Sequence, residues 1–281
     1  MTTTGTAAPA LASGDVPTKL KFFLPDPSGE PAYIYLKIDV PPGKPRRNSV
    51  DDIHDVVVHN ARGLEGTFTL EANGFEFAKH TSAETEFADE EAITTRYYAE
   101  MEELVRKRTG AKRVLIWDHV IRGNWEGMGP DVQRPLDRIH VDQTYAAGPF
   151  IARRFLGEEA EDLLKGRFRI MNVWRPIGAP VYHTPLALAD WRTFSLDDLV
   201  PVRLIFQGSE SDVFNVRYNE NVKWYYLKEH APSEVTLFKC FDSSTDHGDA
   251  RLCPHGSFHD AGSPPDAPQR RSIEVRALVF D

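Results

Sequence analysis

"RIHVDQTY", residues 138–145, places a histidine and an aspartate two positions apart between apolar neighbours. In a β-strand, the period of two sends His140 and Asp142 to one face, while Ile139 and Val141 point to the other. Two such side chains on one face can share a metal ion. The chain has ten histidines and 42 acidic residues, so about one or two His-x-acid triplets are expected by chance, and the surroundings have to decide.

A second triplet of this kind, His247-Gly248-Asp249, has different surroundings. It lies in a run of Ser, Thr, Asp and Gly without an apolar partner. Such a run is typical of a solvated turn, in which side-chain directions are not fixed. We therefore prefer the pair formed by His140 and Asp142.

Composition limits the class of protein. The 281 residues are 41% hydrophobic and 11% aromatic, enough to build a real core. A net charge of -9 argues against nucleic acid, because phosphate binding requires clustered Lys and Arg. The two cysteines, Cys240 and Cys253, provide neither a disulfide framework nor a cysteine zinc site. We therefore expect a small-molecule partner and a reducing compartment.

The N-terminal residues 1–18 are small and polar and lack the basic start and apolar stretch of a secretion signal. No apolar run in the chain approaches the ~18 residues of a membrane span. We expect a cytoplasmic protein without a membrane partner, in which residues 1–18 form a disordered tail.

The pattern of apolar residues predicts a mixed first half and a β-rich second half. In the first half, strands are expected at residues 33–40, 56–63, 66–80 and 113–122, and helices at 89–109 and 146–166. In the second half, strands are expected at 167–177, 200–207, 213–227, 234–243 and 272–280, with a long irregular stretch at 242–269. The second half therefore reads as an antiparallel β module, and nothing indicates two independently folding halves.

A catalytic metal needs a third ligand besides the pair at 140 and 142. The irregular stretch offers three histidines: His247, His255 and His259. We favour His255, because Pro254 fixes its approach and Phe258 can anchor the segment in the core. A single histidine is more often structural, but the upstream pair raises the case for this one. Two histidines and one carboxylate leave three octahedral positions open, as in non-heme iron(II) oxygenases.

The start of the last strand offers a site for a co-substrate. Arg270 and Ser272 share one face, and an arginine fork with a hydroxyl is a good receptor for a carboxylate. Arg276 lies on the same face and competes for this role, whereas Arg271 points the other way. Alternatively, Arg270 and Ser272 are solvent-exposed residues at the start of a strand. The presence of His255 upstream favours carboxylate binding instead.

Together, residues 140–142, His255 and residues 270–272 resemble the His-x-Asp, distal His and Arg-x-Ser series of iron(II) and 2-oxoglutarate-dependent dioxygenases. Longer segments resemble the fungal asaB hydroxylase/desaturase family, which includes gibberellin-desaturase-like and cephamycin-hydroxylase-like members. These segments include "GFEFAKH" (74–80), "MNVWRPIG" (171–178), "YNENVKWYYL" (218–227), "PHGSF" (254–258) and "RRSIEVRALVF" (270–280). The resemblance runs from about residue 30 to the C-terminus.

This resemblance implies a mainly β fold with flanking helices around a double-stranded β-helix (jelly-roll, cupin-like) core. Residues 19–281 would form one domain with an N-terminal α/β elaboration. The implied cofactors are Fe(II) and 2-oxoglutarate, with molecular oxygen as co-substrate. The matching positions are His140, Asp142 and His255 for iron, Arg270 and Ser272 for the distal carboxylate of 2-oxoglutarate, and Asn172 and Trp174 for the lining of its pocket.

The implied activity is hydroxylation or desaturation of an unactivated C–H position of a specialised (secondary) metabolite. Residues in segments that approach the site are candidates for substrate contact, although each alone is more often a packing residue. These candidates are Tyr145, Trp125, Met128, Arg122, Tyr218 and Trp224. The alternatives are an iron oxidase or oxidative rearrangement enzyme that does not use 2-oxoglutarate, a zinc hydrolase, and a non-catalytic cupin-like subunit of a heterodimer. A homodimer is compatible with the fold.

Overall fold

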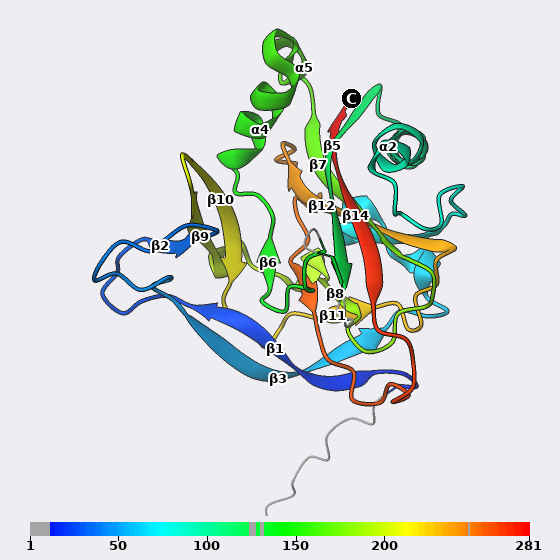
Figure 1. Ribbon diagram of the computed structural model, residues 1–281, viewed down its shortest axis with the longest axis horizontal. Coiled ribbons are helices and arrows are strands. Elements are labelled where there is room, and N and C mark those ends of the chain that lie inside the picture. Colours follow the sequence, from blue (N-terminus) through cyan, green and yellow to red (C-terminus); the bar gives the residue numbers. More distant parts are fainter. Residues whose placement is uncertain (1–11, 124–127, 130–131, 247) are drawn as a thin grey trace, which may run out of the picture.

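Two β-sheets face each other and enclose the core (Figure 1). The computed structural model describes residues 12–123, 128–129, 132–246 and 248–281. In spatial order the larger sheet comprises β1 (Val16–Leu24), β3 (Val50–Asn60), β11 (Trp224–Tyr226), β8 (Leu186–Ala189), β13 (His255–Ser257), β6 (His140–Val141), β10 (Ser209–Val216), β9 (Leu199–Phe206) and β2 (Ala32–Tyr35). The smaller sheet comprises β4 (Phe75–Lys79), β12 (Glu234–Asp242), β7 (Phe168–Pro176), β14 (Arg271–Phe280) and β5 (Arg113–Gly123). The expected mainly β, jelly-roll fold is confirmed.

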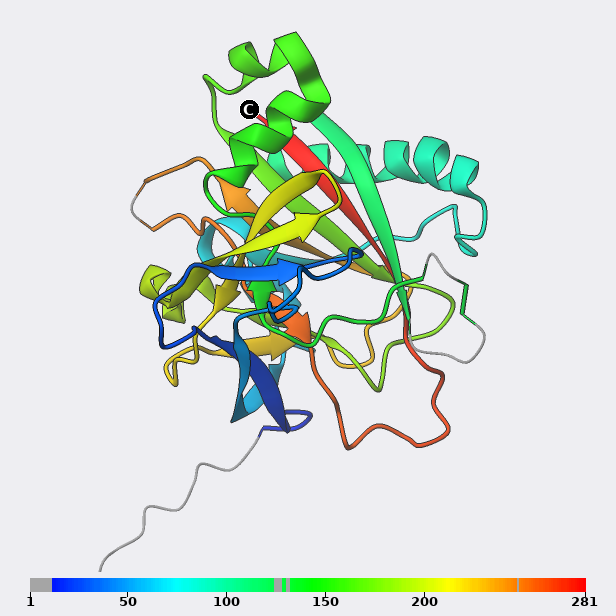
Figure 2. The ribbon, with the colours of Figure 1, turned by 60° about the vertical axis from the view of Figure 1, so that its left-hand side comes forward.

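Helices flank the smaller sheet, as Figure 2 shows. They are α1 (Leu70–Asn73), α2 (Glu90–Ala92), α3 (Tyr98–Thr109), α4 (Ala147–Leu156) and α5 (Ala160–Leu163). Met101 and Leu104 of α3 pack against Val173 of β7 and Val275 of β14. Because side chains alternate along a strand, the residues next to these two valines point inward, toward the larger sheet. No helix of the described residues is long and apolar enough to cross a membrane.

The helix expected at residues 89–109 is confirmed. The Asp89 side chain caps it by accepting a hydrogen bond from the amide of Glu91. Gly110, at φ 72°, ends it in the left-handed conformation that glycine adopts without strain. A π-helical turn, Ile93–Tyr97, joins α2 to α3, and the helical character expected around residues 146–166 is present as α4 and α5.

The strand expected over residues 66–80 is wrong in its first half. Thr69 accepts a hydrogen bond from the amide of Ala72, and Gly74 has φ 84°, so the short helix α1 precedes β4. The strand expected over residues 213–227 is two strands. β10 ends at Val216 and β11 begins at Trp224, because an Asn219 turn accepts from the amide of Asn221 between them.

Strands β1 and β8 were not expected from the pattern of apolar residues. Residues 16–18 belong to β1, which pairs with β3 over its whole length, so the expected disorder of residues 1–18 is wrong for these three. Residues 1–11 lie outside the described part of the chain. The expected irregular stretch 242–269 contains β13, and the strand expected at 33–40 is confined to β2.

Candidate metal centre and adjoining cavities

Three neighbouring strands, β10, β6 and β13, set up the metal centre. His140 of β6 is in register with His255 of β13, and the two imidazole rings lie 4.4 Å apart. Asp142 follows on the same chain, with Oδ1 3.4 Å from Nε2 of His140. One ligand atom from each of these three residues lies within 4.8 Å of the others. The structure thus brings together the three residues singled out in the sequence.

Hydrogen bonds leave one atom of each residue for a metal. The carbonyl oxygen of Arg138 accepts from Nδ1 of His140 at 2.8 Å, and that of Cys253 accepts from Nδ1 of His255 at 3.0 Å. A carbonyl can only accept, so each Nδ1 carries the proton and each Nε2 offers a lone pair. This is the usual outer contact of metal-bound histidine.

Asp142 is held from behind by two donors. Its Oδ2 accepts from Nδ2 of Asn172 at 2.8 Å and from Nε of Arg276 at 3.3 Å. Burial would raise the pKa of Asp142, but Arg276 and the two histidines hold it well below its ordinary value. Burial and the neighbouring His140 lower the pKa of His255 to about 3. At neutral pH the site therefore presents a carboxylate and a neutral imidazole, the forms that bind a metal.

A small cavity of about 20 Å³ adjoins the two histidines. Arg270 lines it and is 3% exposed. Its Nε donates to Oγ of Ser272 at 3.0 Å and its Nη1 donates to the carbonyl oxygen of Thr184 at 2.9 Å. No carboxylate of the described residues lies within ion-pair distance of Arg270, and burial lowers its pKa to about 9. A buried guanidinium without a counter-ion suits an incoming carboxylate.

Arg276, the competitor for this role, is already paired. Its Nη1 lies 2.6 Å from a carboxylate oxygen of Asp118, its Nε lies 3.3 Å from Asp142, and its Nη2 lies 3.6 Å from Glu274. These carboxylates raise the pKa of Arg276 above its ordinary value, despite burial. The geometry favours Arg270 for the co-substrate.

Asn172 and Trp174 take different positions from one another. Asn172 contacts Asp142, as described above, whereas the guanidinium of Arg270 stacks over Trp174 at 4.9 Å. Nε1 of Trp174 and Oγ1 of Thr184 are buried and have no hydrogen-bond partner among the described residues. Unsatisfied polar atoms around Arg270 fit a polar ligand that completes them. Thr184 was not predicted, because an isolated threonine carries no motif.

A larger cavity of about 660 Å³ opens beside His140 and Asp142. Arg122 lines both this cavity and the small one, so its expected place beside the site agrees with the structure. The apolar part of the lining is Ile34, Leu36, Trp117, Leu136, Ile151, Leu204, Phe206 and Val213. None of these apolar residues was predicted, because strands far apart in the sequence bring them together.

The other expected substrate contacts do not line this cavity. Tyr145 packs between Phe214 and Phe241 and lies under the guanidinium of Arg251. Met128 is half-buried outside the lining, and Trp125 lies outside the described residues.

Tyr218 and Trp224 belong to another region of the molecule. Tyr218 stacks on His54 at 3.6 Å, and both Tyr218 and Trp224 pack against Phe22 of β1. The pairing of β11 between β3 and β8 directs Trp224 into a separate core cluster. Neither residue lines the larger cavity beside the metal centre.

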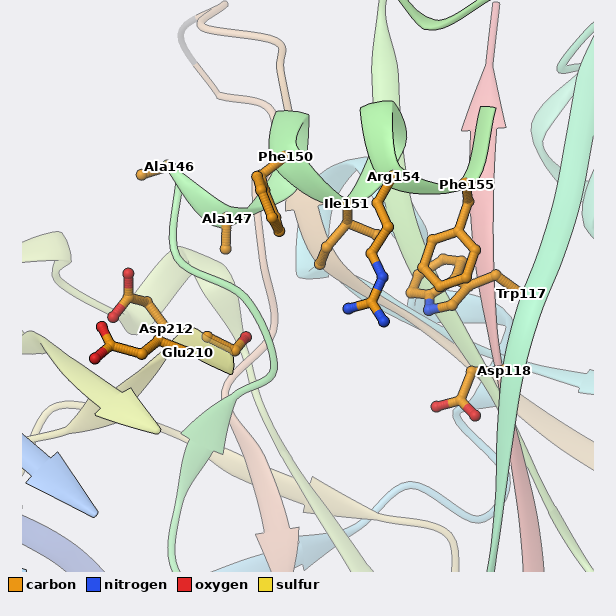
Figure 3. Close-up of a pocket in the computed structure, with 11 residues that line it drawn as sticks. Trp117, Asp118, Ala146, Ala147, Phe150, Ile151, Arg154, Phe155, Glu210 and Asp212 are labelled. Atoms are coloured by element: carbon orange, nitrogen blue, oxygen red, sulfur yellow. The ribbon is translucent and has the colours of Figure 1, made fainter. Parts of the chain in front are cut away.

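Helix α4 borders a third cavity, of about 620 Å³, which shares Trp117, Ile151 and Ser211 with the larger cavity. Figure 3 shows Ile151, Arg154 and Phe155 extending from α4 into this space, with Phe155 next to Trp117 at a ring distance of 5.9 Å. The third cavity and the larger cavity therefore lie next to each other.

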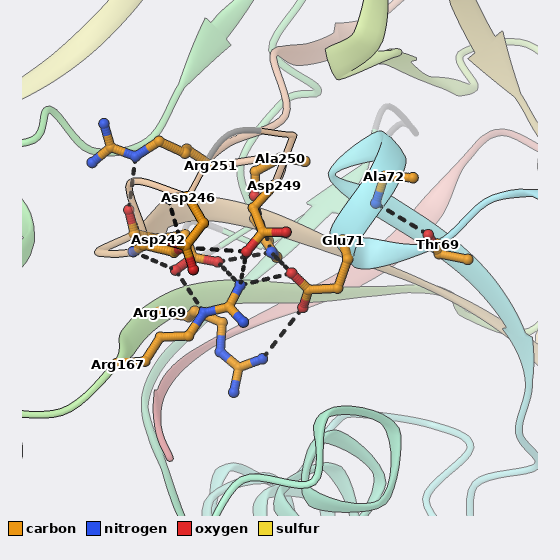
Figure 4. Close-up of polar contacts among 12 residues, drawn as sticks. Thr69, Glu71, Ala72, Arg167, Arg169, Asp242, Asp246, Asp249, Ala250 and Arg251 are labelled. Carbon is orange, nitrogen blue, oxygen red and sulfur yellow. Dashed lines mark hydrogen bonds and ion pairs between the residues drawn. The ribbon is translucent and has the colours of Figure 1, made fainter.

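An ion-pair cluster fixes the loop that leads to His255 (Figure 4). The fully buried ammonium of Lys239 donates to Asp242 at 2.7 Å, to Glu71 at 2.9 Å and to the carbonyl oxygen of Ala250 at 2.9 Å. The backbone of Lys239 also accepts from the amide of Cys253. These contacts hold both ends of residues 243–253 and set the position from which β13 begins.

Gly256 allows β13 to approach β6 closely. A Cβ built on this residue would lie 2.9 Å from Cδ1 of Ile139 and 3.3 Å from the carbonyl oxygen of Arg138. We expect Gly256→Ala to push His255 away from His140, to destabilise the fold by about 1–3 kcal/mol and to weaken metal binding. Metal titration and urea unfolding measure the two effects. Gly262→Ala, in an exposed turn, is the control; equal metal affinity in all three proteins would contradict the expectation.

The fold and site together define a non-heme metal oxygenase, and known proteins agree. A family model described as "Oxidoreductase/YMDC permease-like domain" matches residues 20–280. The Fe(II)/2-oxoglutarate-dependent dioxygenase nvfI of Aspergillus novofumigatus is 33% identical, covering 94% of this chain and 96% of its own. The hydroxylase/desaturase efuI of Hormonema carpetanum is 34% identical, covering 80% and 83%.

Solved structures support the same relationship. The iron and alpha-ketoglutarate-dependent endoperoxidase NvfI superposes with a TM-score of 0.87 at 32% identity, covering 95% of this chain and 98% of that one. The chain belongs to the family of fungal Fe(II)/2-oxoglutarate-dependent dioxygenases and hydroxylase/desaturases. It is an Fe(II)/2-oxoglutarate-dependent oxygenase with a small-molecule substrate and molecular oxygen as co-substrate.

Proposed function

We propose that His140, Asp142 and His255 bind iron(II), and that Arg270 with Ser272 binds the distal carboxylate of 2-oxoglutarate. The enzyme then hydroxylates or desaturates an unactivated C–H position of a secondary metabolite held in the larger cavity. The observation that carries this proposal is the convergence of three metal-binding side chains next to a buried arginine without a counter-ion. Bound iron and 2-oxoglutarate supply oxidising power from molecular oxygen for this reaction.

The residues of the chain have separate tasks in this proposal. The carbonyl groups of Arg138 and Cys253 orient the two imidazoles, and Asn172 and Arg276 orient Asp142. The apolar walls of the larger cavity exclude water from the reacting carbon. Because a displacement of about 1 Å can change the rate 100-fold, the way these walls hold the substrate decides between hydroxylation and desaturation.

Endoperoxide formation is a second candidate, because the similar NvfI structures are named endoperoxidases. Reaction under 18O2 distinguishes the outcomes by mass spectrometry of the product. A hydroxylation product gains one labelled oxygen atom, an endoperoxide gains two, and a desaturation product gains none.

Arg270→Met is expected to weaken 2-oxoglutarate binding by about 30-fold or more, because removing one partner of a buried charge pair costs about 2–5 kcal/mol. The dissociation constant is measured by anaerobic calorimetry on protein loaded with iron(II). Arg271→Met is the control, since Arg271 belongs to the opposite face of the strand. Unchanged affinity in Arg270→Met would refute the assignment of Arg270.

We also propose that the protein is cytoplasmic and that its chain from β1 onward forms one domain. We propose further that it assembles as a homodimer or a heterodimer. A core cluster shared by strands of both sheets supports the single domain.

Phe150 and Phe155 of α4 are 60% and 42% exposed, and such exposed aromatic side chains support a protein interface. Analytical ultracentrifugation of the wild type and of Phe150→Ser tests this: the variant is expected to sediment as a monomer. The negative net charge supports the absence of a nucleic-acid partner.

A further inference from the structure

We propose that the carboxamide of Asn215, together with that of Gln143, binds a neutral oxygen group of the substrate. The cavity would then select a rigid, mostly apolar molecule that carries a hydroxyl or carbonyl group near the carbon to be oxidised. This inference rests on the proposed function, because it assumes that the larger cavity is the substrate site.

The register of the larger sheet places Asn215 beside the metal centre. Asn215 of β10 pairs with His140 of β6, which pairs in turn with His255 of β13. Residues directly opposite each other in antiparallel strands project to the same face, about 5 Å apart. Asn215, His140 and His255 therefore form one row across the sheet, with Asn215 at the end that borders the larger cavity.

One polar atom of each of these two residues has no partner in the described part of the chain. Nδ2 of Asn215 and Oε1 of Gln143 are buried and have no hydrogen-bond partner among the described residues. The two residues are 3% and 6% exposed, and both line the larger cavity. A buried polar group without a partner costs about 1–3 kcal/mol, so the fold carries this cost in the absence of a ligand.

The amide groups match a hydroxyl or a carbonyl. A carboxamide offers two donor hydrogens and one acceptor oxygen, and rotation about its last bond exchanges their positions. A hydroxyl can accept from one amide and donate to the other, and a carbonyl can accept from either. Both are neutral groups: a hydroxyl can accept from Nδ2 of Asn215 and donate to Oε1 of Gln143, and a carbonyl can accept from Nδ2 of Asn215.

The remaining lining indicates the body of the ligand. Away from the metal, the walls are aliphatic and aromatic, with Ile34 of β2, Leu204 and Phe206 of β9, and Val213 of β10 along one sheet face. Such walls favour an apolar skeleton. The amides of Asn215 and Gln143 belong to the polar part of the lining. The polar group of the ligand is therefore expected at the end of the skeleton nearest the metal centre.

The charges around the cavity mouth largely compensate one another. Asp51 accepts hydrogen bonds from Arg47 and Arg138, and Asp137 pairs with Lys21 at 2.5 Å. Lys37 is exposed at the mouth, where it also borders an open surface hollow. Arg122 also lines the cavity and donates to Oε1 of Gln133 at 3.3 Å and to the carbonyl oxygen of Arg134 at 3.1 Å. The group that binds Asn215 and Gln143 is expected to be neutral because both carboxamides are neutral.

The test uses three rigid cages of similar size: 1-adamantanol, 2-adamantanone and 1-fluoroadamantane. Their dissociation constants are measured by anaerobic calorimetry on full-length protein loaded with iron(II) and 2-oxoglutarate. We expect the alcohol and the ketone to bind about tenfold more tightly than the fluoride, because one net hydrogen bond contributes about that factor. In Asn215→Leu the dissociation constants of the alcohol, the ketone and the fluoride are expected to agree within about twofold.

Three further readouts distinguish ligand binding from a structural role. Leucine is nearly isosteric with asparagine and removes an unsatisfied buried donor, so Asn215→Leu is expected to unfold at the same urea concentration as wild type or higher. Its affinity for 2-oxoglutarate is expected to be unchanged. Ser209→Ala, at the exposed start of β10 and outside the cavity lining, is expected to keep the full preference for the alcohol.

The possible outcomes separate the two proposals. If the wild type takes up iron(II) and 2-oxoglutarate but binds none of the cages, or binds all three equally, the inference about Asn215 is wrong and the proposed function stands. A preference retained in Asn215→Leu also overturns it. If the wild type takes up no iron, the proposed function fails, and the same comparison on the metal-free protein still tests the amide pair.

Discussion

Replacement of Asp142 by alanine is expected to abolish iron binding and turnover. Asp142 is the carboxylate of the triad, and without it two neutral imidazoles face the metal. Loss of an outer-contact residue typically costs 10–100-fold in metal affinity, so loss of the ligand itself is expected to cost more than about 100-fold. Metal analysis after anaerobic loading with iron(II) and gel filtration measures the stoichiometry.

Asp118 provides a matched control for this experiment. Asp118 and Asp142 both pair with Arg276, but Asp118 does not belong to the triad. Asp118→Ala is therefore expected to keep one iron per chain. Wild-type stoichiometry in Asp142→Ala would show that the metal is bound elsewhere, and equal loss in both variants would attribute the effect to Arg276.

The second large effect is expected at Asp242, in the ion-pair cluster around Lys239. Asp242 and Lys239 are fully buried and paired at 2.7 Å, and Asp242 also accepts from Nη2 of Arg167 at 2.6 Å. Asp242→Ala leaves the Lys239 ammonium buried with one fewer counter-charge. Breaking a buried pair from one side costs about 3–5 kcal/mol, and urea unfolding measures the loss in free energy of unfolding.

Two further variants test the cause of this loss. Asp246→Ala removes an exposed carboxylate from the same loop (Figure 4) and is expected to change the free energy of unfolding by less than about 0.5 kcal/mol. Replacing both partners, in Lys239→Met with Asp242→Ala, is expected to recover part of the loss, because no unpaired charge remains. An additive double variant would contradict the ion-pair explanation.

The destabilisation by Asp242→Ala is expected to depend on pH. Burial would raise the pKa of Asp242, but hydrogen bonds from Arg167 and the charge of Lys239 hold it below its ordinary value of 3.8. A carboxylate with a lower pKa in the folded state contributes stability above its unfolded pKa and loses it as the pH falls through its folded pKa. The difference between wild type and variant is therefore full at pH 7 and shrinks below about pH 4, as urea unfolding at several pH values can show.

The metal centre was predictable because its signals are local. Asp142 follows β6 two positions after His140, and Arg270 precedes β14 two positions before Ser272. The period of two of an extended chain therefore predicted that each pair shares one face. His255 was chosen among three histidines through its neighbours Pro254 and Phe258. Its strand β13 was missed, because three residues reading His-Gly-Ser carry no alternation.

The substrate cavity was not predictable in the same way. Ile34 reaches the cavity only because β2 pairs in parallel with β9. In this pairing Ile34 lies opposite Leu204, which is 170 residues later in the sequence. Asn215 reaches it because β10 pairs with β6. The aromatic residues that were expected there, Tyr218 and Trp224, satisfy their apolar surface in a different cluster, since their local sequence does not specify which strands lie next to β11.

The most direct test of the metal and co-substrate assignment is an anaerobic titration of the metal-free protein with iron(II) and then 2-oxoglutarate, followed by visible absorption. A charge-transfer band is expected to saturate at one iron and one 2-oxoglutarate per chain. The band is expected to require higher 2-oxoglutarate concentrations in Arg270→Met and to be absent in Asp142→Ala. Iron uptake by the wild type without a band, or an undiminished band in Asp142→Ala, would contradict the assignment.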